Sequence, residues 1–428
     1  MQAPTPAARA STGRSVWLTR NLVVLTLISL TQDAASELLY PLLPILLTGV
    51  LAAPPVVLGL VEGVADATAG VTRYFAGRWS DRRGRKRFIA TGYGLAAVGK
   101  VLVAAATVWP MVLVGRVVDR FGKGVRSAPR DALIAQSVPP EALGRAFGFH
   151  RMGDSLGAVI GPLLGLWALA ALDDDVHAAL WWAVLPATLS ALLVAFVREP
   201  KRATTAPSAE DPVQPAPAPA PHDTPLPRRF WTVTSVLVAI ALVNFSDTLL
   251  LLRVIDLGFS TTQVVLAYVL FNTVYTLGSY PAGALTDRWP RAVVYAVGLL
   301  AFAVGYMGLG LTHGGAPTFV LVGVYGLFPA FTDGVGKAWI ASLVPREHLG
   351  RAQGTFQALN NGAVLAAGLW AGLTWNVGSG DGTVPLVVAG AVAGAAATVM
   401  IILATMGAGS SASGAGRRTR GPRAPALR

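Results

Sequence analysis

Acidic side chains recur one helical turn apart inside long apolar stretches, where a carboxyl group could bind an ion or carry a proton. Two such pairs are Asp33 with Glu37 and Glu62 with Asp66. Desolvation raises the pKa of a carboxyl group and a nearby cation lowers it, so an acid held between these effects can carry a proton. The first candidates for this role are Asp33, Glu37 and Asp66. Further candidates in later apolar stretches are Asp247 and Asp333.

A basic stripe follows these acids along the chain. Arg116, Arg120 and Lys123 recur at helical spacing, and Asp119 lies beside them. At ~3 kcal/mol for each cation near the centre of a bilayer, three cations facing lipid would cost ~9 kcal/mol, so they must face protein or water. Two interpretations stay open. The charges form a structural ion-pair network between the first, second and fourth helices, or some of the acids are coupling sites.

Composition indicates that helices crossing a membrane position these charges. The chain is 53% hydrophobic and 13% charged, with a mean hydropathy of +0.56, whereas about 25% of a soluble protein is charged. Apolar runs long enough to span a bilayer predict twelve helices. Their ranges are 21–50, 56–80, 88–108, 110–136, 146–171, 178–198, 230–254, 262–286, 292–312, 317–343, 352–377 and 384–407.

The position of the basic residues predicts the topology. The net charge is +12, and the cations concentrate before the first span, after the second span and at the end of the chain. Loops on the other side have few Lys or Arg, as the positive-inside rule requires of a multi-pass protein of the cytoplasmic membrane with both termini cytoplasmic. Nucleic-acid binding is excluded, because it needs basic residues gathered on one folded face.

The chain divides into two halves with related sequences. At an offset of 206 residues, Gly77 and Asp81 fall on Gly283 and Asp287, and a cytoplasmic Pro-x-Glu-x-Leu-Gly-Arg recurs. Because each half has six spans, the two halves have the same orientation and an axis along the membrane normal relates them. The expected segments are an N-terminal tail at 1–16, a six-helix bundle at 17–198, a disordered Pro/Ala-rich linker at 199–229, a second bundle at 230–407 and a basic tail at 408–428.

The loop between the second and third spans carries the most specific motif. Its residues are Gly77, Asp81, Arg82, Gly84 and Arg85, and it resembles the Gly-x-x-x-Asp-Arg-x-Gly-Arg loop of the major facilitator superfamily. The resemblance implies a cytoplasmic gating loop, although the basic cluster could serve as a topology signal alone. The second copy, with Gly283, Asp287 and Arg288, departs from the motif at Trp289-Pro290.

A glycine motif in the fifth span resembles that of the proton-coupled exporters in this superfamily. Its members are Gly153, Gly157, Gly161, Pro162 and Gly165. Ordinary close packing of helices is the alternative interpretation. The overlapping Gly153-Asp-Ser-Leu-Gly157 fits a hydrolase nucleophile pattern, which requires a strand before the serine. An apolar helix is predicted there, so we do not expect an enzyme.

A run from Asp119 to Leu133 resembles the signature of one bacterial branch of the superfamily. Some members of that branch are described as nickel-resistance exporters. The chain has no cysteine and five scattered histidines, so we expect no cofactor and no metal site built from those residues.

The resemblance implies an all-α membrane protein of two six-helix bundles, with the first, fourth, seventh and tenth helices lining a central cavity. The leading hypothesis is a monomeric secondary active transporter that exports a drug-like or cationic compound, or a metal, in exchange for protons by alternating access. One alternative is proton-coupled uptake of a small organic anion, drawn by the basic stripe. Another is a membrane sensor that does not transport.

Overall fold

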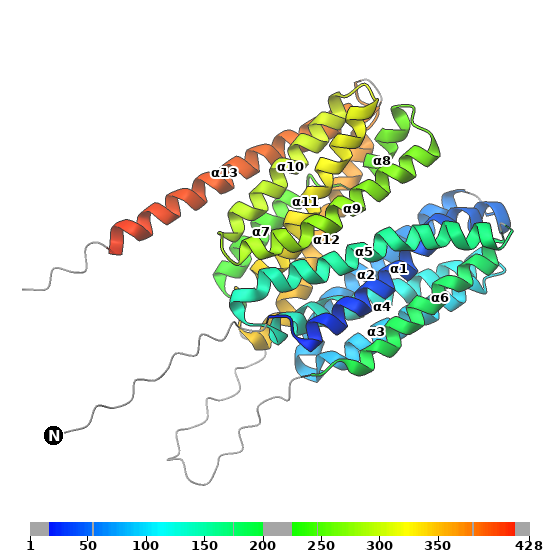
Figure 1. Ribbon diagram of the computed structural model, residues 1–428, viewed down its shortest axis with the longest axis horizontal. Coiled ribbons are helices and arrows are strands. Elements are labelled where there is room, and N and C mark those ends of the chain that lie inside the picture. The colour runs from blue at the N-terminus through cyan, green and yellow to red at the C-terminus, as the bar shows by residue number, and fades with distance from the viewer. Residues whose placement is uncertain are drawn as a thin grey trace, which may run out of the picture.

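The described part of the chain folds into two helical bundles. The computed structural model describes residues 17–415 except 54, 174, 200–224, 246, 379 and 380. Within this part the secondary structure is helical, with no strand. Figure 1 shows α1 to α6 packed in one bundle and α7 to α13 in the other. We call these the N bundle and the C bundle. The expected N-terminal tail, most of the expected linker and the expected C-terminal tail beyond residue 415 lie outside the described residues.

The N bundle contains the six predicted helices with ends close to those expected. They are α1 (Arg20–Pro44), α2 (Pro55–Arg83), α3 (Arg85–Ala104), α4 (Trp109–Ser137), α5 (Leu143–Ala171) and α6 (Val176–Leu193). A π-helical segment, Ile45–Val50, continues α1. Short 3-10 helices, Pro140–Ala142 and Val194–Phe196, precede α5 and follow α6. Gly84 joins α2 to α3 with φ +92°, a conformation that favours glycine.

The C bundle repeats this arrangement with one difference. Its helices are α7 (Arg228–Ala241), α8 (Asp247–Asp256), α9 (Thr261–Thr286), α10 (Arg291–Leu311), α11 (Ala316–Ala341), α12 (Leu349–Thr374) and α13 (Thr383–Ala415), with a 3-10 helix at Arg346–His348. The seventh span, predicted as one helix over 230–254, is broken into α7 and α8. α13 also continues beyond its predicted end at 407.

Tertiary hydrogen bonds stabilise the break in the seventh span. Trp370 Nε1 donates to the Leu242 carbonyl at 2.7 Å, and Tyr306 Oη donates to the Phe245 carbonyl at 3.3 Å. A carbonyl that leaves a helix inside a membrane needs such a partner. The prediction of a continuous helix was wrong because these partners come from distant parts of the chain.

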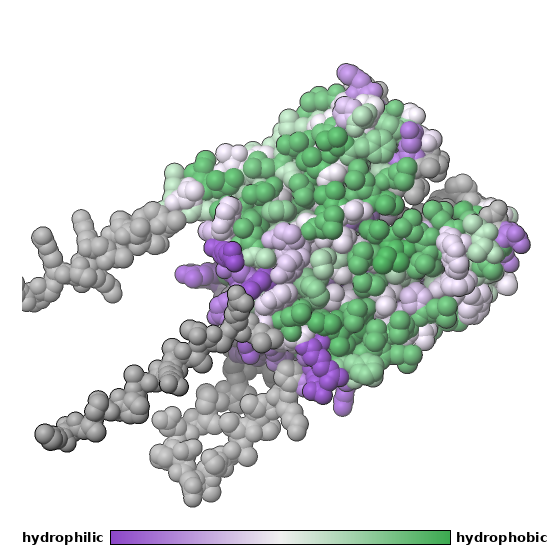
Figure 2. Space-filling model, viewed as in Figure 1, coloured by the Kyte–Doolittle hydropathy of each residue, from purple (hydrophilic) through white to green (hydrophobic). Residues whose placement is uncertain are grey.

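In the described part of the chain, seven helices have the length and apolarity to cross a membrane: α1, α3, α5, α6, α10, α11 and α13. The other spans are too polar or, for α7 and α8, too short. Figure 2 shows hydrophobic residues over much of the side of both bundles, with hydrophilic residues gathered toward the ends. The more polar helices α2, α4, α9 and α12 therefore need to pack against other helices, which shield their polar side chains from lipid.

The bundles touch most closely at the end where α2 gives way to α3, which we call the closed end. A Cβ added to Gly77 would collide with the Gly350 carbonyl, and one added to Gly283 would collide with the Gly144 carbonyl. A hydrophobic cluster joins Phe147 of the N bundle to Leu349 of the C bundle near this end. From there the bundles diverge toward the opposite end, which we call the open end (Figure 1).

Candidate functional site

A cavity of about 480 Å³ lies between the bundles. Its lining comes from α1, α2, α4 and α5 of the N bundle and from α7 to α12 of the C bundle. The helices expected to line it, the first, fourth, seventh and tenth spans, all do so. The fifth, eighth and eleventh spans, which are α5, α9 and α12, contribute as well.

Five of the predicted site residues face this cavity: Asp33, Glu37, Lys123, Asp247 and Asp333. Tyr268 Oη donates to Glu37 Oε2 at 3.2 Å, and Tyr325 Oη donates to Asp247 Oδ1 at 2.6 Å. The side chain of Asp33 contacts that of Asp154. In the part of the chain that the structure describes, neither Asp33, Glu37 nor Asp247 forms an ion pair with a basic side chain.

The other predicted charges do not line the cavity. Glu62 receives two hydrogen bonds from Arg116, at 2.8 and 2.7 Å. Arg120 Nε lies 3.2 Å from Asp66, whose side chain is 69% exposed. These four residues connect α2 with α4, while Asp119 pairs with Lys100 of α3 at 3.0 Å. An ion-pair network therefore exists between α2, α3 and α4. The described residues of α1 add no ion pair to it, but Ser36 Oγ of α1 accepts a hydrogen bond from Lys100 Nζ at 3.2 Å. Asp66, a first candidate for coupling, belongs to this network instead of the cavity.

A buried ion pair that the sequence analysis missed joins the two bundles. Asp131 of α4 is fully buried, and its carboxylate lies 2.8 Å from Lys337 Nζ of α11 and 3.0 Å from Arg130 Nε. Gln357 Nε2 of α12 also donates to it, at 3.0 Å. Asp131 and Lys337 are separated by the repeat offset of 206 residues, which is the signal that could have revealed the pair.

Arg151 of α5 makes the second link between the bundles. Its Nη2 lies 2.6 Å from Asp333 Oδ2 of α11, and its Nη1 pairs with Asp154. Tyr275 Oη also donates to Asp333, at 2.5 Å. Lys337, one helical turn after Asp333, does not neutralise it, because Lys337 pairs with Asp131 and Arg151 pairs with Asp333.

The gating-loop residues meet across the closed end in two related pairs of contacts. Asp81 accepts hydrogen bonds from the backbone N–H groups of Gly350, at 3.0 Å, and Arg351, at 2.7 Å. Asp287 accepts from those of Gly144, at 2.9 Å, and Arg145, at 3.2 Å. Each aspartate therefore sits at the positive N-terminal end of a helix in the opposite bundle.

The remaining members of the loops have different surroundings. Arg85 Nη2 donates to Asp81 Oδ1 at 2.8 Å and to the Arg346 carbonyl at 3.0 Å. The side chains of Arg82 and Arg288 are exposed. Despite the departure at Trp289-Pro290, Asp287 makes the same kind of contact as Asp81.

The glycine motif of α5 packs against α1. A Cβ on Gly157 would lie 2.5 Å from the Leu30 carbonyl, and one on Gly161 would lie 2.7 Å from the Ala34 carbonyl. Gly153 and Gly165 also approach α1, and Pro162 lies inside the same helix. This close seam fixes the part of α1 that carries Asp33 and Glu37.

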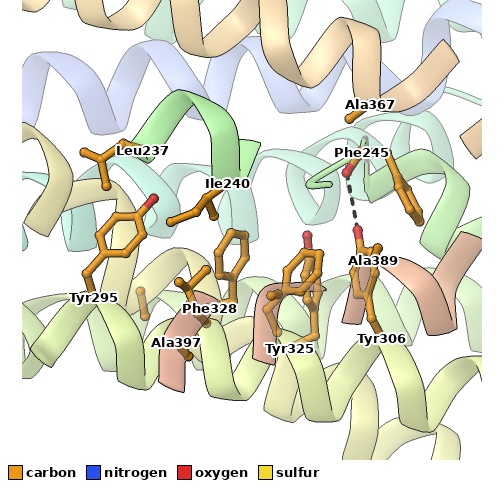
Figure 3. Packing of buried hydrophobic residues seen from close by; sticks show 14 of the residues in the cluster. Leu237, Ile240, Phe245, Tyr295, Tyr306, Tyr325, Phe328, Ala367, Ala389 and Ala397 are labelled. Atoms are coloured by element: carbon orange, nitrogen blue, oxygen red, sulfur yellow. Dashed lines mark hydrogen bonds between the residues drawn. The ribbon is translucent and has the colours of Figure 1, made fainter. Parts of the chain in front are cut away.

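Aromatic side chains form the C-bundle wall of the cavity. Phe271, Tyr275, Tyr325 and Phe328 line it, and the rings of Phe271 and Tyr325 stack with centroids 5.2 Å apart. Figure 3 shows Tyr295, Phe328, Tyr325 and Tyr306 in succession within the buried cluster, with the hydrogen bond from Tyr306 to Phe245. The C-bundle side of the cavity is therefore rich in aromatic rings, and it also carries the charged side chains of Asp247, Asp333 and Lys337.

A sequence profile of the Major Facilitator Superfamily matches residues 25–264 and 250–427. The chain belongs to this family. Its members are transporters, so the chain is a transporter instead of an enzyme. Two six-helix bundles around a central cavity are the major facilitator fold, as the sequence predicted.

Relatives of this major facilitator protein include both distant full-length and partial matches. An uncharacterized MFS-type transporter of Methanocaldococcus jannaschii is 27% identical over 84% of this chain and 89% of its own length. The multidrug resistance protein MdtH of Yersinia enterocolitica is 31% identical over 34% of this chain and 35% of its own length. The solved structure of the human organic anion transporter MFSD10 superposes with a TM-score of 0.73 at 20% identity, covering 89% of this chain and 99% of that one.

Proposed function

We propose that this protein is a proton-coupled secondary active transporter, which moves a small organic solute across the cytoplasmic membrane by alternating access. The observation that carries this proposal is the set of cavity acids, Asp33, Glu37 and Asp247, which have no ion-pair partner among the described residues. An embedded carboxylate without a fixed cation can exchange its proton as the cavity changes the side to which it opens.

Export is the first candidate for the direction of transport. The α5 glycine motif resembles that of exporters, and the partial relative is named a multidrug resistance protein. In an exporter of this kind, proton and solute would compete for the cavity acids. Within the described residues no group of three His, Cys, Asp or Glu side chains could hold a metal ion, so the proposal favours an organic solute over a metal.

Uptake of an organic anion is the second candidate, because the same cavity holds cations that lack a counter-ion. Arg73, Lys123 and Arg126 line it, and no ion pair within 4 Å involves any of them in the described part of the chain. In a symporter of this kind, protonation of the cavity acids would strengthen binding of the anion.

The proposed orientation follows from the charge of the closed end. The exposed cations Arg82, Arg83 and Arg87 lie there, so the positive-inside rule assigns this end to the cytoplasm. The cavity then opens outward, and both chain ends are cytoplasmic. We also propose that the protein works as a monomer.

A dye-based flux measurement tests the proposal. A growth screen against toxic compounds, comparing cells that express the wild type or Glu37→Gln, first identifies a transported solute. Purified protein is then placed in liposomes that contain a pH-sensitive dye, and an inward gradient of that solute is imposed. Antiport makes the lumen more alkaline and symport makes it more acidic, whichever way the protein has inserted.

The control variants separate coupling from stability. Asp33→Asn and Glu37→Gln should abolish the pH change, whereas Glu141→Gln, which alters an exposed carboxylate of the short helix before α5, should not. Transport of the solute by the wild type without any change in lumen pH would contradict proton coupling.

A further inference from the structure

Three cations of the N bundle face the cavity without an ion-pair partner among the described residues, although the guanidinium of one, Arg126, lies 4.5 Å from the centroid of the Tyr93 ring. Arg73 of α2 and Arg126 of α4 are 7% and 3% exposed. Arg73 Nε and Arg126 Nη1 are buried donors with no acceptor. Lys123, one turn before Arg126, likewise has no hydrogen bond or ion pair from its amino group within the described residues. Burying a hydrogen-bond donor without an acceptor destabilises the protein. These groups are therefore suited to bind an acceptor that enters from the cavity.

The three cations form one cluster because α2 and α4 pack closely. A Cβ on Gly124 would lie 2.8 Å from the Ala69 carbonyl. Lys123 lies within electrostatic range of Arg73 and Arg126, and those two lie within range of each other. Like charges at such range repel one another. Among the described residues, no acid of the cavity forms an ion pair with any of the three cations. An anion bound among them would remove this repulsion and satisfy the free N–H donors.

The other cations of the cavity are already neutralised. Arg130 and Lys337 lie within 3.0 Å of Asp131, and Arg151 pairs with Asp154 and Asp333. Arg116 and Arg120, which the sequence suggested for anion binding, pair with Glu62 and Asp66 outside the cavity lining. The capacity to bind an added negative charge is therefore concentrated on Arg73, Lys123 and Arg126.

The wall opposite this cluster selects the rest of the ligand. Phe271, Tyr325 and Phe328 present aromatic surface to the cavity, and Figure 3 shows Tyr325 and Phe328 as neighbours in the buried cluster. An aromatic or flat apolar group packs well on such rings. A cavity of about 480 Å³ is in the range that holds a small organic molecule.

We propose that Arg73, Lys123 and Arg126 form the subsite for the anionic group of a small aromatic anion, such as a carboxylate, sulfonate or phosphate ester, whose ring lies on the aromatic wall. This proposal rests on the proposed function only in taking the cavity as the substrate site. It names the class of solute, and binding alone can test it.

The test compares ligands that share one ring system and differ in charge. Wild-type protein in lipid nanodiscs is titrated with naphthalene-2-sulfonate, with neutral 2-naphthamide and with trimethyl(2-naphthyl)ammonium, using calorimetry and thermal stabilisation. The sulfonate should bind saturably and at least about tenfold more tightly than the other two ligands. That difference corresponds to one good charged contact, which the other two ligands lack. Preference for the ammonium, or failure of the sulfonate to bind, would overturn the proposal.

Variants then locate the site. Arg73→Gln, Lys123→Gln and Arg126→Gln should each weaken sulfonate binding at least about tenfold, Arg126→Lys should weaken it less, and Arg228→Gln, at an exposed position of α7, should not change it. If all three Gln variants bind the sulfonate as tightly as the wild type does, the assignment is refuted. If a Gln variant does not fold, the comparison of the three ligands on the wild type still decides. Sulfonate binding without proton-coupled flux would contradict the proposed function and leave this subsite standing.

Discussion

The Asp287 carboxylate of the C bundle accepts a hydrogen bond from the Gly144 N–H of the N bundle, at 2.9 Å. Asp81 makes the equivalent contact with the Gly350 N–H, at 3.0 Å. The duplicated Gly-x-x-x-Asp of each half thus binds the duplicated Leu-Gly-Arg of the other half. Two copies of one sequence repeat close the same end of the molecule.

Neutralising these aspartates should open the closed end. Hydrogen bonds to a charged group contribute about 1.5–3 kcal/mol each, so Asp81→Asn together with Asp287→Asn should shift the equilibrium strongly. The chain has no cysteine, so Ala128→Cys supplies a unique reporter at a buried position near Gly354. We expect an impermeant maleimide to label it at least about tenfold faster in the double variant. Unchanged labelling would show that the aspartates do not hold this end shut.

A steric change at the same contact should act in the same direction. The Cβ of Gly77→Ala would fall on the Gly350 carbonyl, whereas a Cβ on Gly70 of the same helix meets nothing within 4 Å. Overpacking costs about 1–3 kcal/mol. Gly77→Ala should therefore lower the melting temperature in detergent and speed the labelling of the Ala128→Cys reporter, while Gly70→Ala should change neither. Equal behaviour of the two variants would argue against close packing at Gly77.

The Asp131–Lys337 pair should stabilise the contact between the bundles. Removing one partner of a buried pair costs about 3–5 kcal/mol, so Asp131→Asn and Lys337→Gln should each destabilise the protein in mixed-micelle unfolding. The double variant should lose about 0.5–3 kcal/mol less than the sum of the single losses. Strict additivity would mean that the two charges do not interact in the membrane-embedded protein.

Binding of an aromatic sulfonate should tighten as pH falls. The sulfonate keeps its charge across this range, whereas protonation of Asp33 and Glu37 removes negative charge near the cation cluster. Calorimetry between pH 7.5 and pH 5.5 should show a rising affinity in the wild type and a flatter profile in Asp33→Asn/Glu37→Gln. By linkage, this sign couples proton and anion movement in the same direction, as in the second candidate for the direction of transport, anion uptake by symport. Weaker binding at low pH would indicate competition and hence exchange.

The sequence predicted the helices well because apolar length is a strong signal, and the ends of α9 and α11 lie within two residues of the predicted ranges. It failed at the break between α7 and α8. No Pro or Gly marks residues 242–246, and the carbonyls there depend on Trp370 and Tyr306.

The site was predicted only in part, because periodicity shows that a charge must avoid lipid but does not identify its partner. Asp66 and Glu37 were both first candidates for coupling, yet Asp66 pairs with Arg120 and Glu37 faces the cavity. Arg73 lacked a distinctive pattern, and Arg126 lies in the run from Asp119 to Leu133 but was not predicted to be a site residue. Both residues matter because each has a buried N–H donor without an acceptor. This is visible in the three-dimensional structure and not in the sequence.

Distance measurements across both ends of the molecule test alternating access most directly. Pulsed electron paramagnetic resonance on two double-cysteine proteins in nanodiscs would use Glu141 with Trp289 at the closed end, and Ala171 with Ile255 at the open end, all at exposed positions. The account predicts that Asp81→Asn/Asp287→Asn lengthens the Glu141–Trp289 distance and shortens the Ala171–Ile255 distance. No change in the first distance, or lengthening of both together, would contradict a rocking of the two bundles about the cavity.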